Sequence, residues 1–457
     1  MPLDDGARAG TRWLDEPVES GRRAGFGVYL HVPFCHHRCG YCDFAVAAVG
    51  GLDTARRDDL ESRYVTAVTA DLARQVAAGP QGHAPAPRTH AAGPQGHAPA
   101  PQGHAAGPQG HAPAPRTHAA EVDRDLGVDW PEVTSIYVGG GTPTLLAPDQ
   151  LAAVVAAVRR ELDVAADAEV TVEANPETAS AELFATLAEA GVNRLSIGAQ
   201  SFTPEVLTTL ERGHGPEAPL AAVELARAAG ISELSLDLMY GTPGERDEDW
   251  EATLAQVLLA DVAHVSAYAL TIHEGTPFGR RVDRGGLADI DEDVQAGRFE
   301  ALHRILTAGG FEHYEVSNLS RGPGARSRHN LLYWRHGDYL GVGAGAHGHL
   351  SGRRWWSQRS TPRYIHAVEE AGAAPWGVGP TPVVGDEVLD PTQRAAERLL
   401  LGLRVREGIH PNDLPPISPL ALEDALTAGL VETACGRLRC TERGWFLLDD
   451  AVDRLTV

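Results

Sequence analysis

Cysteine is scarce in this chain, with only five among 457 residues. A disulfide framework needs an even set of cysteines in a small secreted chain, so the odd, low count argues against one. Residues 1–28 carry Asp, Glu and Arg without an apolar run, so we expect no secretory leader. Few cysteines, most of them clustered, fit a reducing cytoplasm, which is the compartment that we expect.

Long apolar runs and positive charge are also lacking. No stretch of about 18 apolar residues occurs, so we expect no transmembrane segment. Lys and Arg total 39 against 62 Asp and Glu, which gives a formal charge of -23. Such a field repels phosphate backbones, so we expect no nucleic-acid partner. The length predicts two or three domains with enough chain for a large core.

Residues 79–120 form three near-perfect copies of a 14-residue unit with three prolines and no large apolar residue. Such a segment cannot bury a core or run as a helix, so we predict a disordered insertion there. We also predict a flexible tail over 1–24. The histidines of the repeat recur every seventh residue, from His83 to His118. Two interpretations stay open: a metal- or heme-collecting tract, and a repeat expansion in a tolerant surface connection.

Three of the cysteines, Cys35, Cys39 and Cys42, share one short loop with the spacing C-x3-C-x2-C. Three thiolates can hold three corners of a four-iron cluster and leave the fourth iron open to a ligand that is not protein. Structural zinc wants four ligands, usually as two C-x2-C pairs, and no second pair follows. His36 or His37 could be the fourth ligand, although both are crowded into the same loop. The spacing favours a [4Fe-4S] cluster, with zinc or inert thiols as alternatives.

Short apolar runs alternate with longer stretches of helical periodicity between residues 28 and 270. The predicted strands are Val28–His31, Ser135–Val138, Glu169–Glu173, Arg194–Ile197, Glu233–Leu238 and His264–Ala269. The predicted helices between them include Pro148–Leu162, Ala181–Ala190 and Pro216–Ala229. Six β-α units in series imply an α/β fold whose parallel sheet curves into a full or partial barrel. Active sites of such folds lie at the carboxyl ends of the strands.

Glycines and polar residues follow these strands one after another. Gly139–Gly141 comes after the second strand, and its glycines let the backbone approach a ligand closely. Glu173 follows the third strand and can accept a hydrogen bond from a ligand amine or hydroxyl. Gln200 follows the fourth, and Arg212 lies twelve residues further on, with a guanidinium that suits a carboxylate. Asp237 follows the fifth, where a ribose diol is a natural partner.

The C-terminal part predicts a small separate domain over 386–457. Helices are predicted over Pro391–Val405, over Ala421–Gly429 and from Arg443, with a hairpin of Leu430–Thr433 and Arg437–Thr441 before the last helix. This order is that of a winged helix. Such units often bind DNA, but this one is not notably basic, so we expect a lid or a partner surface.

On these motifs the chain resembles the radical S-adenosylmethionine enzymes. More narrowly, it is similar to the branch that contains oxygen-independent coproporphyrinogen dehydrogenase and the HemW-type heme chaperones. Besides the cysteines, the motifs are G-G-G-T-P-T ending at Thr144, V-E-A-N-P ending at Pro176, R-L-S-I-G-A-Q-S-F ending at Phe202, and Asp237 with its Y-G-T-P-G tail. The resemblance implies a partial, TIM-like (β/α)6 barrel over 25–275, an extension over 276–385, and a helical, winged-helix-like C-terminal domain.

The resemblance also implies the ligands of the site. In this family the amine and carboxylate of S-adenosylmethionine chelate the open iron of the cluster. Carried over by matching position, nine residues would bind this cofactor: Tyr29, Tyr41, Gly140, Gly141, Thr142, Glu173, Gln200, Arg212 and Asp237.

Two features separate the members of that branch. The dehydrogenase has a fourth cysteine two residues after the third, a position that is Phe44 here. The chaperones carry an H-N-x-x-Y-W motif, which runs from His329 to Trp334 in this chain. Its histidine suits heme iron, and Tyr333 and Trp334 offer flat faces to a porphyrin. His347 and other histidines remain rival ligands.

The resemblance therefore implies a cytoplasmic heme chaperone that carries a [4Fe-4S] cluster and S-adenosylmethionine. Its partners would be heme, heme-acceptor proteins such as respiratory enzymes, and a second copy of the chain in a homodimer. The cluster would serve assembly or dimerisation as much as turnover. The alternative is an enzyme that oxidatively decarboxylates the propionates of coproporphyrinogen III. Methyl or sulfur transfer would usually bring further cysteines or extra cluster domains, and only Cys435 and Cys440 remain.

Overall fold

The computed structural model describes residues 25–83, 129–376 and 378–456. The predicted tail over 1–24 and repeat residues 84–120 lie outside this part of the chain. Within the described residues, no helix has the length and apolar character needed to cross a membrane.

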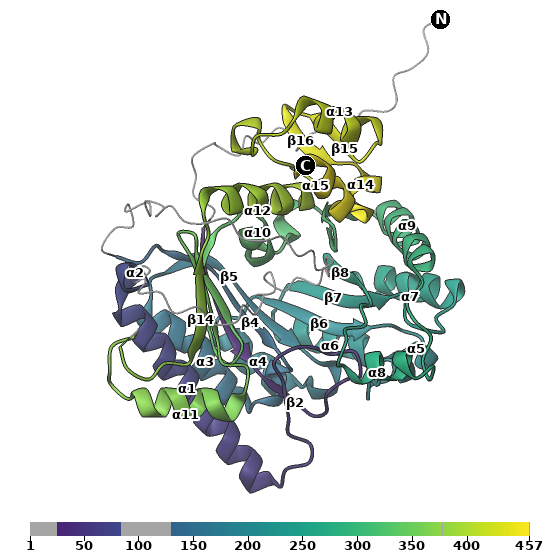
Figure 1. The fold of residues 1–457 in the computed structure, drawn as a ribbon. Coiled ribbons are helices and arrows are strands. Elements are labelled where there is room, and N and C mark those ends of the chain that lie inside the picture. The colour runs from purple at the N-terminus through teal and green to yellow at the C-terminus, as the bar shows by residue number, and fades with distance from the viewer. Residues whose placement is uncertain (1–24, 84–128, 377, 457) are drawn as a thin grey trace, which may run out of the picture.

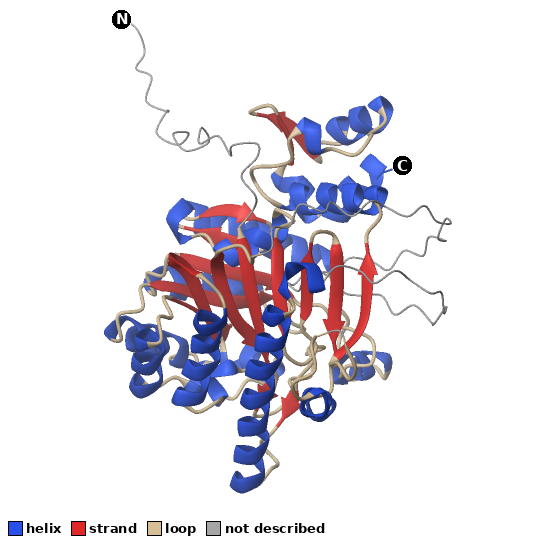
Figure 2. Ribbon diagram, turned by 90° about the vertical axis from the view of Figure 1, so that its left-hand side faces the viewer, coloured by secondary structure: helices blue, strands red, loops and turns tan. Residues whose placement is uncertain are grey.

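One twelve-stranded sheet forms the centre of the molecule, in the order β14-β13-β12-β11-β1-β4-β5-β6-β7-β8-β10-β9 (Figures 1 and 2). Its parallel core consists of β1 (Phe26–Val32), β4 (Val133–Gly140), β5 (Val164–Ala174), β6 (Arg194–Gln200), β7 (Glu233–Tyr240) and β8 (His264–Ala269). All six predicted strands are confirmed, each within a longer observed one or matching it. The sheet stays open because β1 pairs with β11 and β8 pairs with β10, so the barrel is partial.

Alternation along each strand decides which side chains face the inside of the barrel. In β1, the apolar Val28 and Leu30 are buried on the outer side, while Tyr29 and His31 share the inner side and bond to each other. Helices cover the outer face (Figure 2): α1 (Thr54–Ala77), α3 (Pro148–Glu161), α4 (Ala181–Glu189), α6 (Ala218–Ala228), α7 (Asp247–Leu259) and α9 (Glu292–Ala308). The apolar core thus lies between sheet and helices, and the barrel interior is left to polar groups.

Shorter elements complete the two sheet edges and the loops. On the β1 side these are β11 (Asp338–Val342), β12 (His347–Leu350), β13 (Arg353–Ser357), β14 (Val383–Val388) and the covering helix α11 (Thr361–Ala371). On the β8 side they are β9 (Glu312–Glu315) and β10 (Asn318–Ser320). The others are β2 (Phe34–Cys35), β3 (Ala47–Ala48), α2 (Gly79–Gly82), α5 (Pro204–Thr209), α8 (Pro277–Asp283) and α10 (Arg328–Trp334), with four short 3-10 turns.

The C-terminal domain has the predicted order of elements. It contains α12 (Pro391–Arg404), α13 (Pro419–Thr427), β15 (Val431–Ala434), β16 (Arg437–Cys440), α14 (Glu442–Phe446) and α15 (Leu448–Thr456). Asp390 and Gln393 form a capping box that fixes the start of α12. Figure 1 shows α12 next to α10 and the rest of this domain above them, at the end of the molecule away from β2.

The start of the repeat is folded, so the prediction of a helix-free insertion over all of 79–120 is wrong there. Gly79–Gly82 forms the one-turn helix α2, in which Pro80 occupies the first turn, where its fixed φ fits. His83 is buried, and its ring stacks on Trp376 at 3.9 Å between centroids. It also meets Trp130 at 5.4 Å. The first repeat histidine therefore belongs to the core.

This packing predicts that His83 contributes to the stability of the fold. We expect His83→Ala to lower the free energy of unfolding by about 2–4 kcal/mol, because it empties a buried aromatic site. Deletion of 84–120 should leave that free energy nearly unchanged, since the His83–Trp130 contact holds the two ends together. Urea unfolding measures both, with the exposed His366→Ala as control. Equal losses in the deletion and His83→Ala would contradict the prediction.

Candidate cluster and cofactor site

The three clustered cysteines lie in a loop that follows β1 and is closed by pairing of β2 with β3. All three thiols are partly buried. Burial raises the pKa of Cys35 to about 12 and that of Cys42 to about 11, and neighbouring thiolates add to both shifts. Thiols in such a place become thiolates when a metal binds them.

Two donors stand against these sulfurs. The Thr142 hydroxyl lies 3.8 Å from the Cys35 sulfur, and Nη1 of Arg212 lies 4.0 Å from the Cys39 sulfur. Donors of this kind stabilise metal-bound thiolates. In the described part of the chain, no three His, Cys, Asp or Glu side chains gather closely enough to share one metal ion. Three partly buried thiols on one loop, two of them with a nearby donor, fit an iron–sulfur cluster.

The glycine turn after β4 holds the cysteine loop in place. Gly140 has φ +120°, and a Cβ there would lie 2.4 Å from the His31 ring. A Cβ on Gly141 would lie 2.6 Å from the Phe34 carbonyl oxygen, against which the backbone packs. The Thr142 N–H donates to that same carbonyl at 2.6 Å. The glycines are thus required by close contact with β1 and with the cysteine loop, and this contact places Thr142 beside Cys35.

Glu173 is an inward-facing acceptor near the end of β5. Its carboxylate accepts from the Tyr137 hydroxyl at 2.8 Å and from the Gly140 N–H at 2.9 Å. Burial raises the pKa of Glu173 to about 7, although both hydrogen bonds oppose the shift. A ligand amine would favour the ionised carboxylate.

Gln200 and Arg212 meet beside Gly198. Gln200 has φ +64° at an irregularity in the pairing of β6 with β7, which turns its side chain back. A Cβ on Gly198 would lie 3.0 Å from Nε2 of Gln200 and 3.9 Å from Nη2 of Arg212. The buried Nε of Arg212 has no hydrogen-bond partner among the described residues. These donors suit a carboxylate ligand.

Asp237 lies deeper than the sequence suggested. It sits within β7, three residues before the terminal Tyr240, and not at the strand end. Both of its oxygens accept from the Ser196 hydroxyl at 2.8 Å, and Ser235 donates to one at 3.3 Å. Burial raises the pKa of Asp237. A ribose hydroxyl would have to share this carboxylate with the serines.

Two tyrosines complete the set of predicted cofactor ligands. Tyr29 donates to or accepts from Nδ1 of His31 at 2.9 Å, and Nε2 of that histidine lies 2.9 Å from the Ala45 carbonyl oxygen in the cysteine loop. Tyr41 packs edge-on against Phe278 at 6.0 Å. Sequence reasoning missed His31 and Tyr137, although the alternation of Tyr29 and His31 in a buried strand is a signal for inward-facing polar groups.

The H-N-x-x-Y-W segment lies at the opposite end of the barrel. His329 on α10 is buried, with Nδ1 2.9 Å from the Ser135 hydroxyl and Nε2 2.7 Å from the Tyr333 hydroxyl. Its ring stacks on Tyr137 at 5.2 Å, and burial lowers its pKa to about 3. The buried Trp334 lies 4.3 Å below the Arg404 guanidinium of α12. In this conformation the motif joins the barrel to the C-terminal domain, and His329 has both ring nitrogens engaged.

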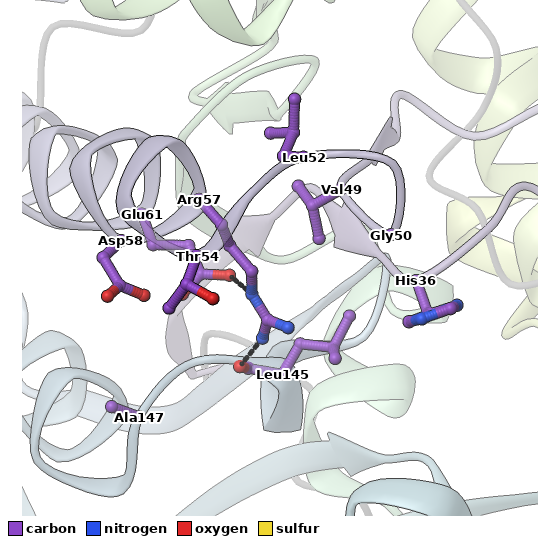
Figure 3. Close-up of a pocket in the computed structure, with 10 residues that line it drawn as sticks. All are labelled: His36, Val49, Gly50, Leu52, Thr54, Arg57, Asp58, Glu61, Leu145 and Ala147. Atoms are coloured by element: carbon purple, nitrogen blue, oxygen red, sulfur yellow. Dashed lines mark hydrogen bonds and ion pairs between the residues drawn. The ribbon is translucent and has the colours of Figure 1, made fainter.

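A pocket of about 320 Å³ opens beside the cysteine loop (Figure 3). His36, Val49 and Gly50 form its loop side, and Arg57 on α1 bonds to Glu61 and to the Leu145 carbonyl oxygen at its base. None of the nine predicted cofactor ligands lines it. The pocket therefore flanks the candidate site and is separate from it.

Comparison with known proteins shows which families the chain is similar to. Residues 94–257 match the radical SAM superfamily, and residues 389–447 match the HemN C-terminal domain. The heme chaperone HemW of Mycobacterium tuberculosis is 39% identical over 433 residues, 94% of either chain. HemW of Escherichia coli is 36% identical over 324 residues, covering 71% of this chain and 70% of that one.

A solved structure shows the same fold. The coproporphyrinogen III oxidase HemN of Escherichia coli superposes with a TM-score of 0.69 at 17% identity, over 95% of this chain and 90% of that one. The likeness extends to the C-terminal domain, and at this identity it speaks for the fold alone. From the near full-length similarity to the curated relatives, the chain belongs to the radical SAM superfamily and, within it, to the HemW family.

Proposed function

We propose that this protein is a heme chaperone that binds heme and transfers it to acceptor proteins such as respiratory enzymes. The observation that carries the proposal is 39% identity over nearly the whole length to a relative named as a heme chaperone. Phe44, at the place of the fourth cysteine of the dehydrogenases, supports it. The proposal includes a cytoplasmic location and a homodimer.

The proposal also includes the two bound groups at the carboxyl end of the barrel. Cys35, Cys39 and Cys42 would hold a [4Fe-4S] cluster, and the described ring of side chains would hold S-adenosylmethionine. Together, when bound, these groups supply one-electron chemistry. The protein's part is to orient: Glu173 accepts from the ligand amine, and Arg212 donates to the ligand carboxylate. The apolar cluster of Tyr41, Val206, Leu210, Met239 and Leu270 borders this region and keeps water out.

Heme binding should be visible directly. Heme added to the purified, cluster-loaded chain should give a shifted Soret band. The intensity of this band should saturate at a fixed ratio of heme to protein. In parallel, the same preparation with S-adenosylmethionine and a reductant should leave coproporphyrinogen III unchanged under anaerobic conditions. Conversion of coproporphyrinogen III to protoporphyrinogen without a Soret shift would contradict the chaperone function and support the dehydrogenase function.

The raised pKa of Glu173 predicts a pH dependence of cofactor binding. Below about pH 7 the carboxyl is increasingly protonated, so it no longer accepts from the ligand amine. Affinity for S-adenosylmethionine should therefore rise by about tenfold between pH 6 and pH 8, as the ionised fraction grows. Isothermal titration across this range measures it, and Glu173→Gln should flatten the profile. A profile unchanged by that substitution would remove Glu173 from the site.

The effect of Glu173 on the stability of the cofactor-free fold has the opposite pH dependence to its effect on cofactor affinity. Without cofactor, a carboxyl whose pKa is higher in the folded state stabilises the fold when protonated. That contribution is complete below the unfolded pKa of about 4.3 and is lost as pH rises through about 7. Cofactor should therefore raise the unfolding midpoint more at pH 8 than at pH 6.

A further inference from the structure

His347 stands at the same end of the barrel as the cysteines. It opens β12, directly after the turn that follows β11, and β11 runs parallel to β1. A Cβ on Gly343 of this turn would lie 2.7 Å from the His31 carbonyl oxygen. A Cβ on Gly345 would lie 2.5 Å from that of Ala45. The turn that carries His347 is therefore packed directly on the cysteine loop.

The imidazole of His347 lies next to the indole of Trp356. Its register partner on β13 is Trp356, and the two rings lie nearly parallel, 26° apart with centroids at 6.1 Å. Gly385 is the register partner of Trp356 on β14, and a Cβ there would lie 2.3 Å from the indole. The missing side chain lets the indole lie flat across that strand. Both rings are partly exposed.

The ring nitrogens of His347 are uncommitted. Among the described residues, neither has a hydrogen-bond partner, whereas both nitrogens of His329 and of His31 are engaged. Burial, and then the positive charges of Arg359 and Arg354, lower the pKa of His347 to about 4. At neutral pH it is an uncharged imidazole, which is the form that binds iron.

A cation completes the set. Arg359 is exposed, and its guanidinium donates to the backbone carbonyl of Asp43 in the cysteine loop. Its remaining N–H groups can pair with a carboxylate. Heme presents iron, an apolar macrocycle and carboxylate side chains. His347 can bind the iron, the edge of the Trp356 indole can contact the macrocycle, and Arg359 can pair with a carboxylate.

We propose that heme docks on the inner edge of β12 and β13, with His347 as the axial ligand of the iron. Because an axial imidazole stands upright on the porphyrin plane, the nearly parallel indole of Trp356 meets the macrocycle with its edge, and Arg359 pairs with a propionate. This inference rests on the proposed heme-chaperone function and deepens it. It places heme beside the cysteine loop and leaves His329 with its role in joining α10 to the barrel.

Heme titration of the full-length, cluster-loaded chain tests the assignment. His347→Ala should weaken heme binding at least tenfold and remove the spectroscopic signature of imidazole-ligated iron. Added imidazole should restore that signature, because it occupies the vacated position. His347→Met should keep a ligand and shift the band positions. Arg359→Glu should raise the Kd several-fold without changing the axial-ligand spectrum, and the exposed His366→Ala is the control.

The outcomes distinguish the assignment of His347 from the heme-binding function on which it rests. A wild-type chain that shows no Soret shift overturns the heme-binding function, and the assignment with it. A wild-type shift that His347→Ala leaves intact in position and affinity overturns the assignment alone. Unchanged iron and sulfide content in the variants shows that the loop beside them is still folded.

Discussion

Alanine at any one of Cys35, Cys39 or Cys42 should abolish the iron–sulfur cluster. Each thiolate would hold a different iron, so the loss of one leaves that iron without its protein ligand. Acid-labile sulfide and iron per chain should fall to background, and the broad visible absorbance should disappear. Because the cofactor would bind to the open iron, S-adenosylmethionine affinity should fall with it.

The chain provides matched controls for this experiment. Cys435, which is exposed, and Cys440, which is buried in the hairpin of the C-terminal domain, lie outside the loop. Cys435→Ala and Cys440→Ala should keep full iron and sulfide. A loop variant that retained the complete cluster would refute the assignment of its thiol.

Arg404→Met should destabilise the fold strongly. Arg404 on α12 and Glu315 on β9 form an ion pair at 2.9 Å, with 5% and 0% of their side chains exposed. Arg404 also lies over Trp334. Without the guanidinium, the buried Glu315 carboxylate keeps only its hydrogen bonds from Asn318 and from the Ser317 N–H. The free energy of unfolding should therefore fall by about 3–5 kcal/mol.

Chemical unfolding measures this loss against two references. Arg335→Met removes a partly exposed partner of Glu407. We expect this variant to lose about 1 kcal/mol or less of the free energy of unfolding. The double variant Arg404→Met with Glu315→Gln should recover part of the loss, since no charge is left buried. Equal effects at Arg335 and Arg404 would mean that burial does not strengthen the interdomain pair.

Patterns along the chain were sufficient for the barrel strands and for the winged-helix order, because apolar alternation and helical period are local properties. The strands of residues 338–388 were not predicted. They pair with distant partners, as β11 does with β1, and this pairing leaves little trace in the sequence.

The candidate site was predictable only in part. Arg212 could be named from a motif, but its approach to Cys39 depends on a loop 173 residues away. The burial of His329 illustrates the opposite limit. The motif around it suggests a ligand, while the contacts with Ser135 and Tyr333 that occupy its nitrogens come from the tertiary fold.

The meeting of His83 with Trp130 has an evolutionary consequence. Because these two rings, on either side of residues 84–128, lie in contact, the number of 14-residue copies between them can change without moving a strand. Replication slippage that adds or removes whole copies would then leave the folding of the described residues unchanged, so selection for folding would not act on the number of copies. The segment between His83 and Trp130 is therefore also a suitable position for inserting a reporter domain.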